Sequence, residues 1–153
     1  MCGLPGTGKS TSATPFREMT DWFVYSTDDY LEMIAVRQNQ TYNDVFNEYI
    51  KQATQEMDTK LEVALKNNRN VIWDQTNLNR KKRDRVLSRF PGYHKTCWYF
   101  PLYTDQYGKW FNRLADRMGK TVPVKVIQNM ILRFEMPVLD EGFHELIYKD
   151  TGL

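Results

Sequence analysis

The sequence has few of the residues from which disulfide frameworks and metal clusters are built. Its 153 residues include only two cysteines, Cys2 and Cys97, too few for a framework of disulfides or a cysteine-based metal cluster. There is no apolar run long enough to span a bilayer, no signal peptide, no internal repeat and no low-complexity segment. We therefore expect a protein of the reducing cytoplasm that has no membrane partner.

A strong charge of either sign is also lacking. The formal net charge is +2, which neither requires nor excludes a polyanionic partner, because a local basic surface matters more than the total. With 41% hydrophobic and 26% charged residues, the chain suits one globular domain over residues 1–153. The composition leaves the oligomeric state open.

A phosphate-binding loop begins the chain. Residues 3–11, Gly-Leu-Pro-Gly-Thr-Gly-Lys-Ser-Thr, fit the P-loop pattern, although a glycine-rich turn can match it by chance. Glycines let backbone N–H groups approach the phosphates, Lys9 supplies a positive charge, and Ser10 offers a hydroxyl to Mg²⁺. We expect ATP and Mg²⁺ as ligands. The expected nucleotide-binding residues of the loop are Gly3, Gly6, Thr7, Gly8, Lys9, Ser10 and Thr11.

Strands and helices alternate after this loop. Periodicity predicts helices over about 9–19, 42–66, 80–90, 104–118 and 123–134, and strands over about 22–26, 71–74, 94–102 and 143–149. This order predicts an α/β protein with the three-layer P-loop NTPase fold and a parallel sheet of about five strands. Only Met1 and Cys2 precede the loop, so we expect most of the first strand to lie outside this sequence.

Two aspartates follow predicted strands, at the sheet edge where ligands of parallel sheets bind. Asp28 is the candidate base that orients the acceptor hydroxyl and takes its proton, and the alternative is a helix cap. Asp74 ends its strand as a Walker-B acid does and is a candidate Mg²⁺ ligand with Ser10, the alternative being an ordinary turn aspartate.

Basic residues form two groups. Arg113 and Arg117 share one helix face ahead of Gly119, which suits a lid over about 113–122 that grips phosphates, the alternative being an exposed face where Asp116 pairs with Arg113. The helix predicted at 80–90 carries six cations, which form either a solvated face or a binding surface. These six are Arg80, Lys81, Lys82, Arg83, Arg85 and Arg89.

Four blocks of the sequence resemble the kinase domain of 5′-hydroxyl polynucleotide kinases of the phage and bacterial end-healing type. The blocks are the P-loop at 3–11, Asp-Asp-Tyr at 28–30, Asp-Gln-Thr-Asn-Leu-Asn at 74–79, and Arg-Leu-Ala-Asp-Arg with a following Val-Pro at 113–123. Together they span most of the chain, and the last two are more selective than the P-loop alone.

The resemblance implies an ATP-dependent kinase that phosphorylates the 5′-hydroxyl end of DNA or RNA. It implies that Lys9 and Ser10 serve ATP and Mg²⁺, that Asp28 is the general base, and that Arg113 and Arg117 clamp phosphates, so the expected catalytic residues are Asp28, Lys9 and Arg117. The family commonly has an arginine three residues after the base that touches the acceptor strand's phosphate, where this sequence has Leu31. Either Arg37 or the basic helix compensates, or the substrate lacks a 3′-phosphate. Two rivals remain: a P-loop kinase of a nucleoside or other small molecule, and a non-catalytic nucleotide-binding module.

Overall fold

The computed structural model describes residues 1–153 as two compact units. Unit 1 comprises Met1–Lys9, Thr76–Asp116 and Val122–Leu153, and unit 2 comprises Ser10–Gln75 and Arg117–Thr121. The P-loop motif at 3–11 therefore lies mostly in unit 1, while its last two residues, Ser10 and Thr11, belong to unit 2 on helix α1 (Lys9–Ala13). None of the helices combines the length and the apolar character needed to cross a membrane.

Unit 1 is built on the parallel strands β3 (Thr96–Tyr99) and β4 (Glu145–Tyr148). Cys2 forms a single parallel bridge to Tyr99, with its N–H donating to the Trp98 carbonyl at 2.8 Å. Its own carbonyl accepts the Phe100 N–H at 2.8 Å. The two hydrogen bonds place the start of the chain beside β3 and carry it directly into the phosphate loop.

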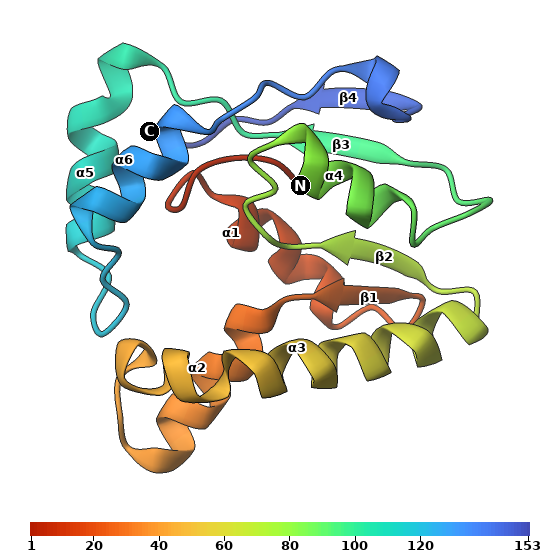
Figure 1. Ribbon diagram of the computed structural model, residues 1–153, viewed down its shortest axis with the longest axis horizontal. Helices are drawn as coiled ribbons and strands as arrows, with labels where there is room; N and C mark the ends of the chain where they lie inside the picture. Colours follow the sequence, from red (N-terminus) through yellow and green to blue (C-terminus); the bar gives the residue numbers. More distant parts are fainter. The chain divides into compact units, whose positions relative to one another are not determined.

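The helices of unit 1 cover an apolar core behind the loop. On α5, Trp110 and Leu114 pack with Ile127 of α6 and with Leu4 of the loop. Figure 1 shows α5 and α6 side by side. Pro123 directly precedes α6, where its fixed φ suits the start of a helix. The helical elements of this unit are α4 (Arg80–Leu87), η2 (Thr104–Gln106), α5 (Tyr107–Ala115), α6 (Val124–Leu132) and η3 (Leu139–Glu141).

Unit 2 pairs β1 (Trp22–Tyr25) in parallel with β2 (Asn70–Trp73). Helix α3 (Tyr42–Lys66) has the bounds that its apolar spacing predicted, and it runs along α2 (Thr27–Gln38) and β1 (Figure 1). Val45 and Ala53 of α3 pack against Leu31 and Ala35 of α2. The apolar stripe of α3 is therefore core.

Some expectations for the elements were wrong. Instead of about five strands in one sheet, the structure has four strands in two parallel pairs. Cys2, where only the end of a first strand was expected, contributes a single bridge. The helix predicted at 9–19 is shortened, as a proline inside it favours: α1 is followed by the 3₁₀ helix η1 (Thr14–Arg17), with Pro15 in its first turn. Helix α2 was not predicted. The architecture remains α/β, with parallel strands and six α-helices.

Candidate active site

The phosphate loop in unit 1 has the backbone that its glycines allow. Gly6 and Gly8 have φ angles of +79° and +90°, in the left-handed region that residues with a Cβ seldom adopt. The Lys9 ammonium donates to the Leu4 carbonyl at 2.7 Å, and the Thr7 hydroxyl donates to the same oxygen at 2.9 Å. Lys9 is only 7% exposed, so water screens its charge only weakly. The loop thus presents a desolvated cation within a turn suited to anions.

Side chains from α5 fix the loop from behind. The Trp110 Nε1–H donates to the Pro5 carbonyl at 2.7 Å. Arg113 Nη1 donates to the carbonyls of Gly6 at 3.2 Å and Thr151 at 2.8 Å, while its Nη2 donates to Gly152 at 2.6 Å. Arg113 therefore ties the end of the chain to the loop, and its expected role as a phosphate clamp remains a prediction.

Ser10 and Asp74 lie in unit 2, where Arg17 contacts both. Arg17 Nη1 donates to the Ser10 carbonyl at 3.3 Å, and its Nη2 lies 3.6 Å from Asp74 Oδ2. The same guanidinium grips Asp29 through two hydrogen bonds of 2.9 and 3.0 Å. Thr11 is exposed on α1. Sequence reasoning missed Arg17, which is the positive partner of Asp29 and Asp74.

The donors at Ser10 and Asp74 fit a magnesium ion chemically. Mg²⁺ is usually held by one or two carboxylates with water and substrate phosphates. Asp74 is a carboxylate with only 3% of its side chain exposed, a setting in which a nearby cation is favourable, as the Arg17 contact indicates. No cluster of three or more His, Cys, Asp or Glu side chains offers an all-protein site. Any metal here would depend on the nucleotide for its other ligands.

Asp28 is not the cap of the helix that it begins. Ser26 is the N-cap of α2, and its hydroxyl accepts the Asp29 N–H at 3.2 Å. Asp28 lies in the first turn, directly after the parallel strand β1. The cap alternative is therefore wrong for Asp28, and its carboxylate is available for side-chain contacts.

Two donors hold the Asp28 carboxylate. The Tyr42 hydroxyl donates to Oδ1 at 2.8 Å, and the Lys120 ammonium donates to Oδ2 at 2.7 Å. Burial raises the pKa of Asp28, but Lys120, Tyr42 and Arg117 together lower it by more, so the net pKa lies below its ordinary value. Burial and the Asp28 charge both raise the pKa of Tyr42, so the phenol stays protonated as a donor. Asp28 is thus an ionised, oriented acceptor at neutral pH.

Arg117 belongs to unit 2 and acts on Asp28 through its charge. The segment expected as a lid, 113–122, begins on α5, which ends at Ala115 in unit 1. The turn Arg117–Thr121 that follows belongs to unit 2. A grip of Arg117 on phosphate remains a prediction.

A family comparison agrees with the loop and the parallel strands. A family model described as an AAA domain, AAA_33, matches residues 1–137. The chain belongs to the AAA_33 family. This family is of the P-loop NTPase type and includes kinases, so nucleotide binding is the expected activity of the loop and phosphotransfer is consistent with it.

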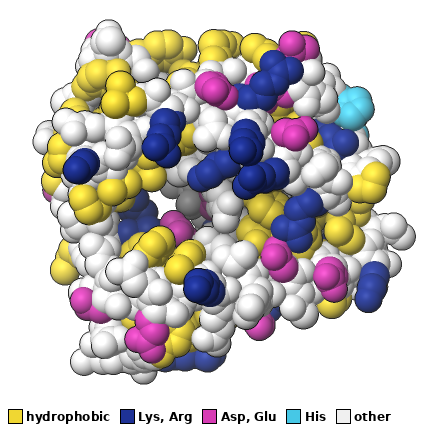
Figure 2. Space-filling model, viewed as in Figure 1, with side chains coloured by type: hydrophobic (Ala, Val, Ile, Leu, Met, Phe, Trp, Pro, Cys, Tyr) yellow, Lys and Arg dark blue, Asp and Glu magenta, His cyan; other side chains and the backbone are white.

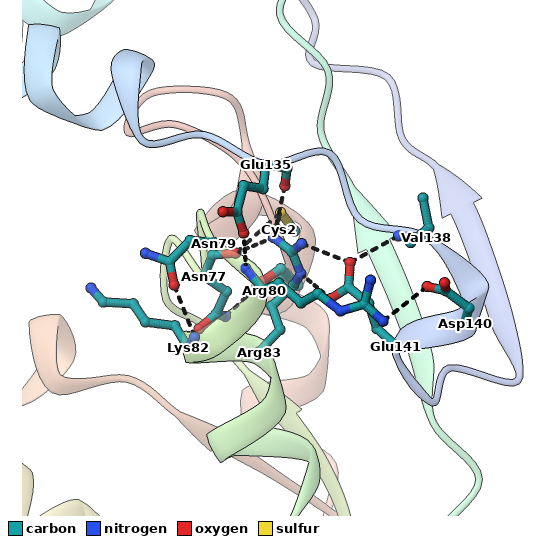
Figure 3. Close-up of polar contacts among 11 residues, drawn as sticks. Cys2, Asn77, Asn79, Arg80, Lys82, Arg83, Glu135, Val138, Asp140 and Glu141 are labelled. Atoms are coloured by element: carbon teal, nitrogen blue, oxygen red, sulfur yellow. Dashed lines mark hydrogen bonds and ion pairs between the residues drawn. The ribbon is translucent and has the colours of Figure 1, made fainter.

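The basic helix of this AAA_33 domain has two kinds of cation. Arg83 is buried, grips Glu141 at 2.6 and 2.7 Å, and donates to the carbonyls of Asn77 and Glu135 (Figure 3). Lys81, Lys82 and Arg85 are exposed. Figure 2 shows Lys and Arg side chains gathered over α4. The pocket of about 1160 Å³ beside α4 is lined by residues of both charges, so it does not by itself define an anion site.

The two cysteines of the AAA_33 domain are free and buried. Burial raises the pKa of Cys97 to about 11, and it also raises the pKa of Cys2 despite the neighbouring Arg83. Both thiols therefore stay protonated and are poor nucleophiles.

Tyr42 and Lys120 are the partners of Asp28 that sequence reasoning missed. Lys120 is 92 residues from Asp28 along the chain, and Tyr42 was read only as the start of a core helix. Neither contact follows a helical or strand period. The one available signal was Gly119, which marks a turn just before Lys120.

Proposed function

We propose that this protein is an ATP-dependent kinase that transfers the γ-phosphate to the 5′-hydroxyl of a DNA or RNA end. The observation that carries the proposal is the state of Asp28. This carboxylate follows a parallel strand, is not used as a helix cap, and is held ionised by Tyr42 and Lys120. A module that only binds the nucleotide has no need of such an acceptor-side base.

In this proposal, Lys9 acts on the nucleotide phosphates and Asp28 acts on the acceptor hydroxyl. The acceptor oxygen forms a bond to the γ-phosphorus while the bond from that phosphorus to the β–γ bridging oxygen breaks, and ADP leaves. Asp28 orients the acceptor hydroxyl and takes its proton late in the reaction. Lys9 offsets charge on the β and γ phosphates. Mg²⁺, bound to the nucleotide with Ser10 and Asp74, would offset the remaining charge.

The polynucleotide acceptor is favoured by the exposed cations of α4. Lys81, Lys82 and Arg85 offer phosphate contacts that would lie outside the reacting groups and depend on salt. A kinase of a small hydroxyl compound is the second candidate. It is favoured by Leu31, which is fully buried and cannot contact an acceptor phosphate as an arginine would.

The first test is transfer of label from γ-labelled ATP to an oligonucleotide in the presence of Mg²⁺. DNA and RNA strands of one sequence are compared, each with a 5′-hydroxyl or a 5′-phosphate end. We expect label only on the 5′-hydroxyl strands. Label on nucleosides or sugars, with none on oligonucleotides, would select the small-molecule kinase.

The second test separates a kinase from a binding module. Asp28→Asn keeps the shape of the side chain and removes the base, so it should abolish transfer while ADP binding, measured by calorimetry, stays near that of the wild type. Asp105→Asn, at an exposed position of η2, is the matched control and should transfer normally. Full transfer by Asp28→Asn would exclude Asp28 as the base.

A further inference from the structure

The turn Arg117–Thr121 is anchored to the start of α3. The Asn43 N–H donates to the Gly119 carbonyl at 3.2 Å, and the Asn43 side-chain amide donates to the Thr121 carbonyl at 3.0 Å. These bonds hold both residues that flank Lys120. Gly119 has a φ of +69°, and a Cβ there would lie 3.2 Å from the Thr41 Cβ. The turn therefore has a defined shape that only glycine supports well.

The start of α3 is itself fixed. Thr41 caps the helix, and the Asp44 carboxylate accepts from the Thr41 N–H at 2.9 Å and from its hydroxyl at 2.7 Å. This capping box sets the first turn, where Tyr42 faces Asp28 and Asn43 faces the turn. One helix terminus thus orients both groups that hold the Asp28 carboxylate.

The Lys120 ammonium has three partners. It donates to Asp28 Oδ2 and to Glu32 Oε1, each at 2.7 Å, and it lies 4.3 Å from the centre of the Tyr42 ring. Only 13% of its side chain is exposed. A cation held between two acids of one helix and an aromatic face has little freedom to move away.

We propose that Lys120 is a positioning residue for Asp28, held by the anchored turn so that the carboxylate keeps one orientation for an acceptor hydroxyl. This inference rests on the proposed kinase function for its catalytic consequence. Tyr42 takes a lone pair on Oδ1 and Lys120 takes one on Oδ2, which fixes the plane of the carboxylate. Further lone pairs of the two oxygens remain for the acceptor.

The charged groups that face Asp28 determine the pH dependence. Lys120 and Arg117 favour the ionised carboxylate, and Tyr42 donates to it without changing charge. Glu32 shares Lys120, so removing the ammonium leaves two acids without this counter-charge. The pKa of Asp28 should then rise. Since the base must be ionised, activity in such a variant should begin to fall at a higher pH.

Lys120→Met tests the proposal, because it keeps most of the side-chain bulk and removes the charge. We expect kcat to fall by roughly 10- to 100-fold through misorientation, with the KM for ATP nearly unchanged. The acid limb of the pH–rate profile should move to higher pH, and Lys120→Arg should restore part of the rate. Lys60→Met, on the exposed face of α3, is the matched control and should behave as wild type.

A carboxyl NMR titration of Asp28 gives a readout that does not need kinase activity. In full-length protein with ¹³C-labelled aspartate, the Asp28 resonance, assigned through Asp28→Asn, should titrate at higher pH in Lys120→Met than in the wild type. If the wild type transfers no phosphate, the proposed function fails, but this titration still decides whether Lys120 holds Asp28. An unchanged titration, or wild-type kcat and acid limb in Lys120→Met, would overturn the inference.

Discussion

Replacing Arg83 with methionine should remove a large part of the stability of the protein. Arg83 and Glu141 each have 2% of the side chain exposed, and their two hydrogen bonds measure 2.6 and 2.7 Å. Methionine leaves the Glu141 carboxylate buried without its counter-charge, and breaking such a pair costs about 3–5 kcal/mol. Because a domain is stable by only about 5–15 kcal/mol, the loss should be obvious in unfolding.

Circular dichroism measures this loss, as a lower free energy of unfolding in urea and as a lower Tm on heating. At about 2–4 °C per kcal/mol for a chain of this size, Tm should fall by roughly 6–20 °C. Arg85→Met, at an exposed position of the same helix, should change stability by no more than about 0.5 kcal/mol. The double variant Arg83→Met/Glu141→Met should recover most of the loss, since no unpaired charge remains.

The sign of the pH dependence follows from Glu141. Burial raises the pKa of Glu141, but Arg83 and the Val138 N–H together lower it by more, so its net pKa is below the ordinary value. The pair therefore stabilises the fold above the ordinary glutamate pKa, and this contribution is lost as the pH falls through the lowered value. The difference between wild type and Arg83→Met should shrink in acid. A difference under about 1 kcal/mol at pH 7 would refute the reasoning and return Arg83 to the set of cations available for ligands.

Three other substitutions probe the site. Lys9→Ala should lower transfer by about 10²- to 10³-fold, the scale of losing one electrostatic stabiliser, and wild-type turnover would remove Lys9 from the mechanism. Asp74→Asn should raise the Mg²⁺ concentration that gives half-maximal transfer, measured by titration at fixed ATP; an unchanged requirement would exclude it as a ligand. Arg113→Met releases the carbonyls of Thr151 and Gly152, so the segment should open more often and its amides should exchange faster, measured by mass spectrometry; wild-type exchange would contradict the tether.

Local patterns predicted well those features that depend on neighbours in the chain. The P-loop follows from glycine spacing, and Gly6 and Gly8 have the positive φ angles that the motif requires. Helix α3 follows from an apolar stripe at helical spacing, and its bounds were predicted to the residue. Helix α2 was missed because charged and small residues interrupt its apolar positions, and the contact of Leu31 with α3 is visible only in the fold.

Features that depend on distant residues could not be predicted. The sequence left Asp28 open between a cap and a base, and the hydroxyl of Ser26 decides against the cap because it already accepts the Asp29 N–H. The basic helix was treated as a single surface, but a helix turns about 100° per residue, which points Arg83 inward while Lys82 stays exposed. Nothing local to Arg83 names Glu141 as its partner, since the two are 58 residues apart.

Leu31 is explained by packing. It is fully buried between α2 and α3, among Ala35, Val45 and Ala53, so a charged side chain at that position would have to be desolvated inside the core. The cation beside Asp28 therefore cannot come from position 31 in this fold, and it comes instead from Lys120. Packing thus explains why position 31 is a leucine, and the Asp28 carboxylate has its close basic partner in Lys120. The comparison of 5′-hydroxyl and 5′-phosphate strands then tests the proposed acceptor directly.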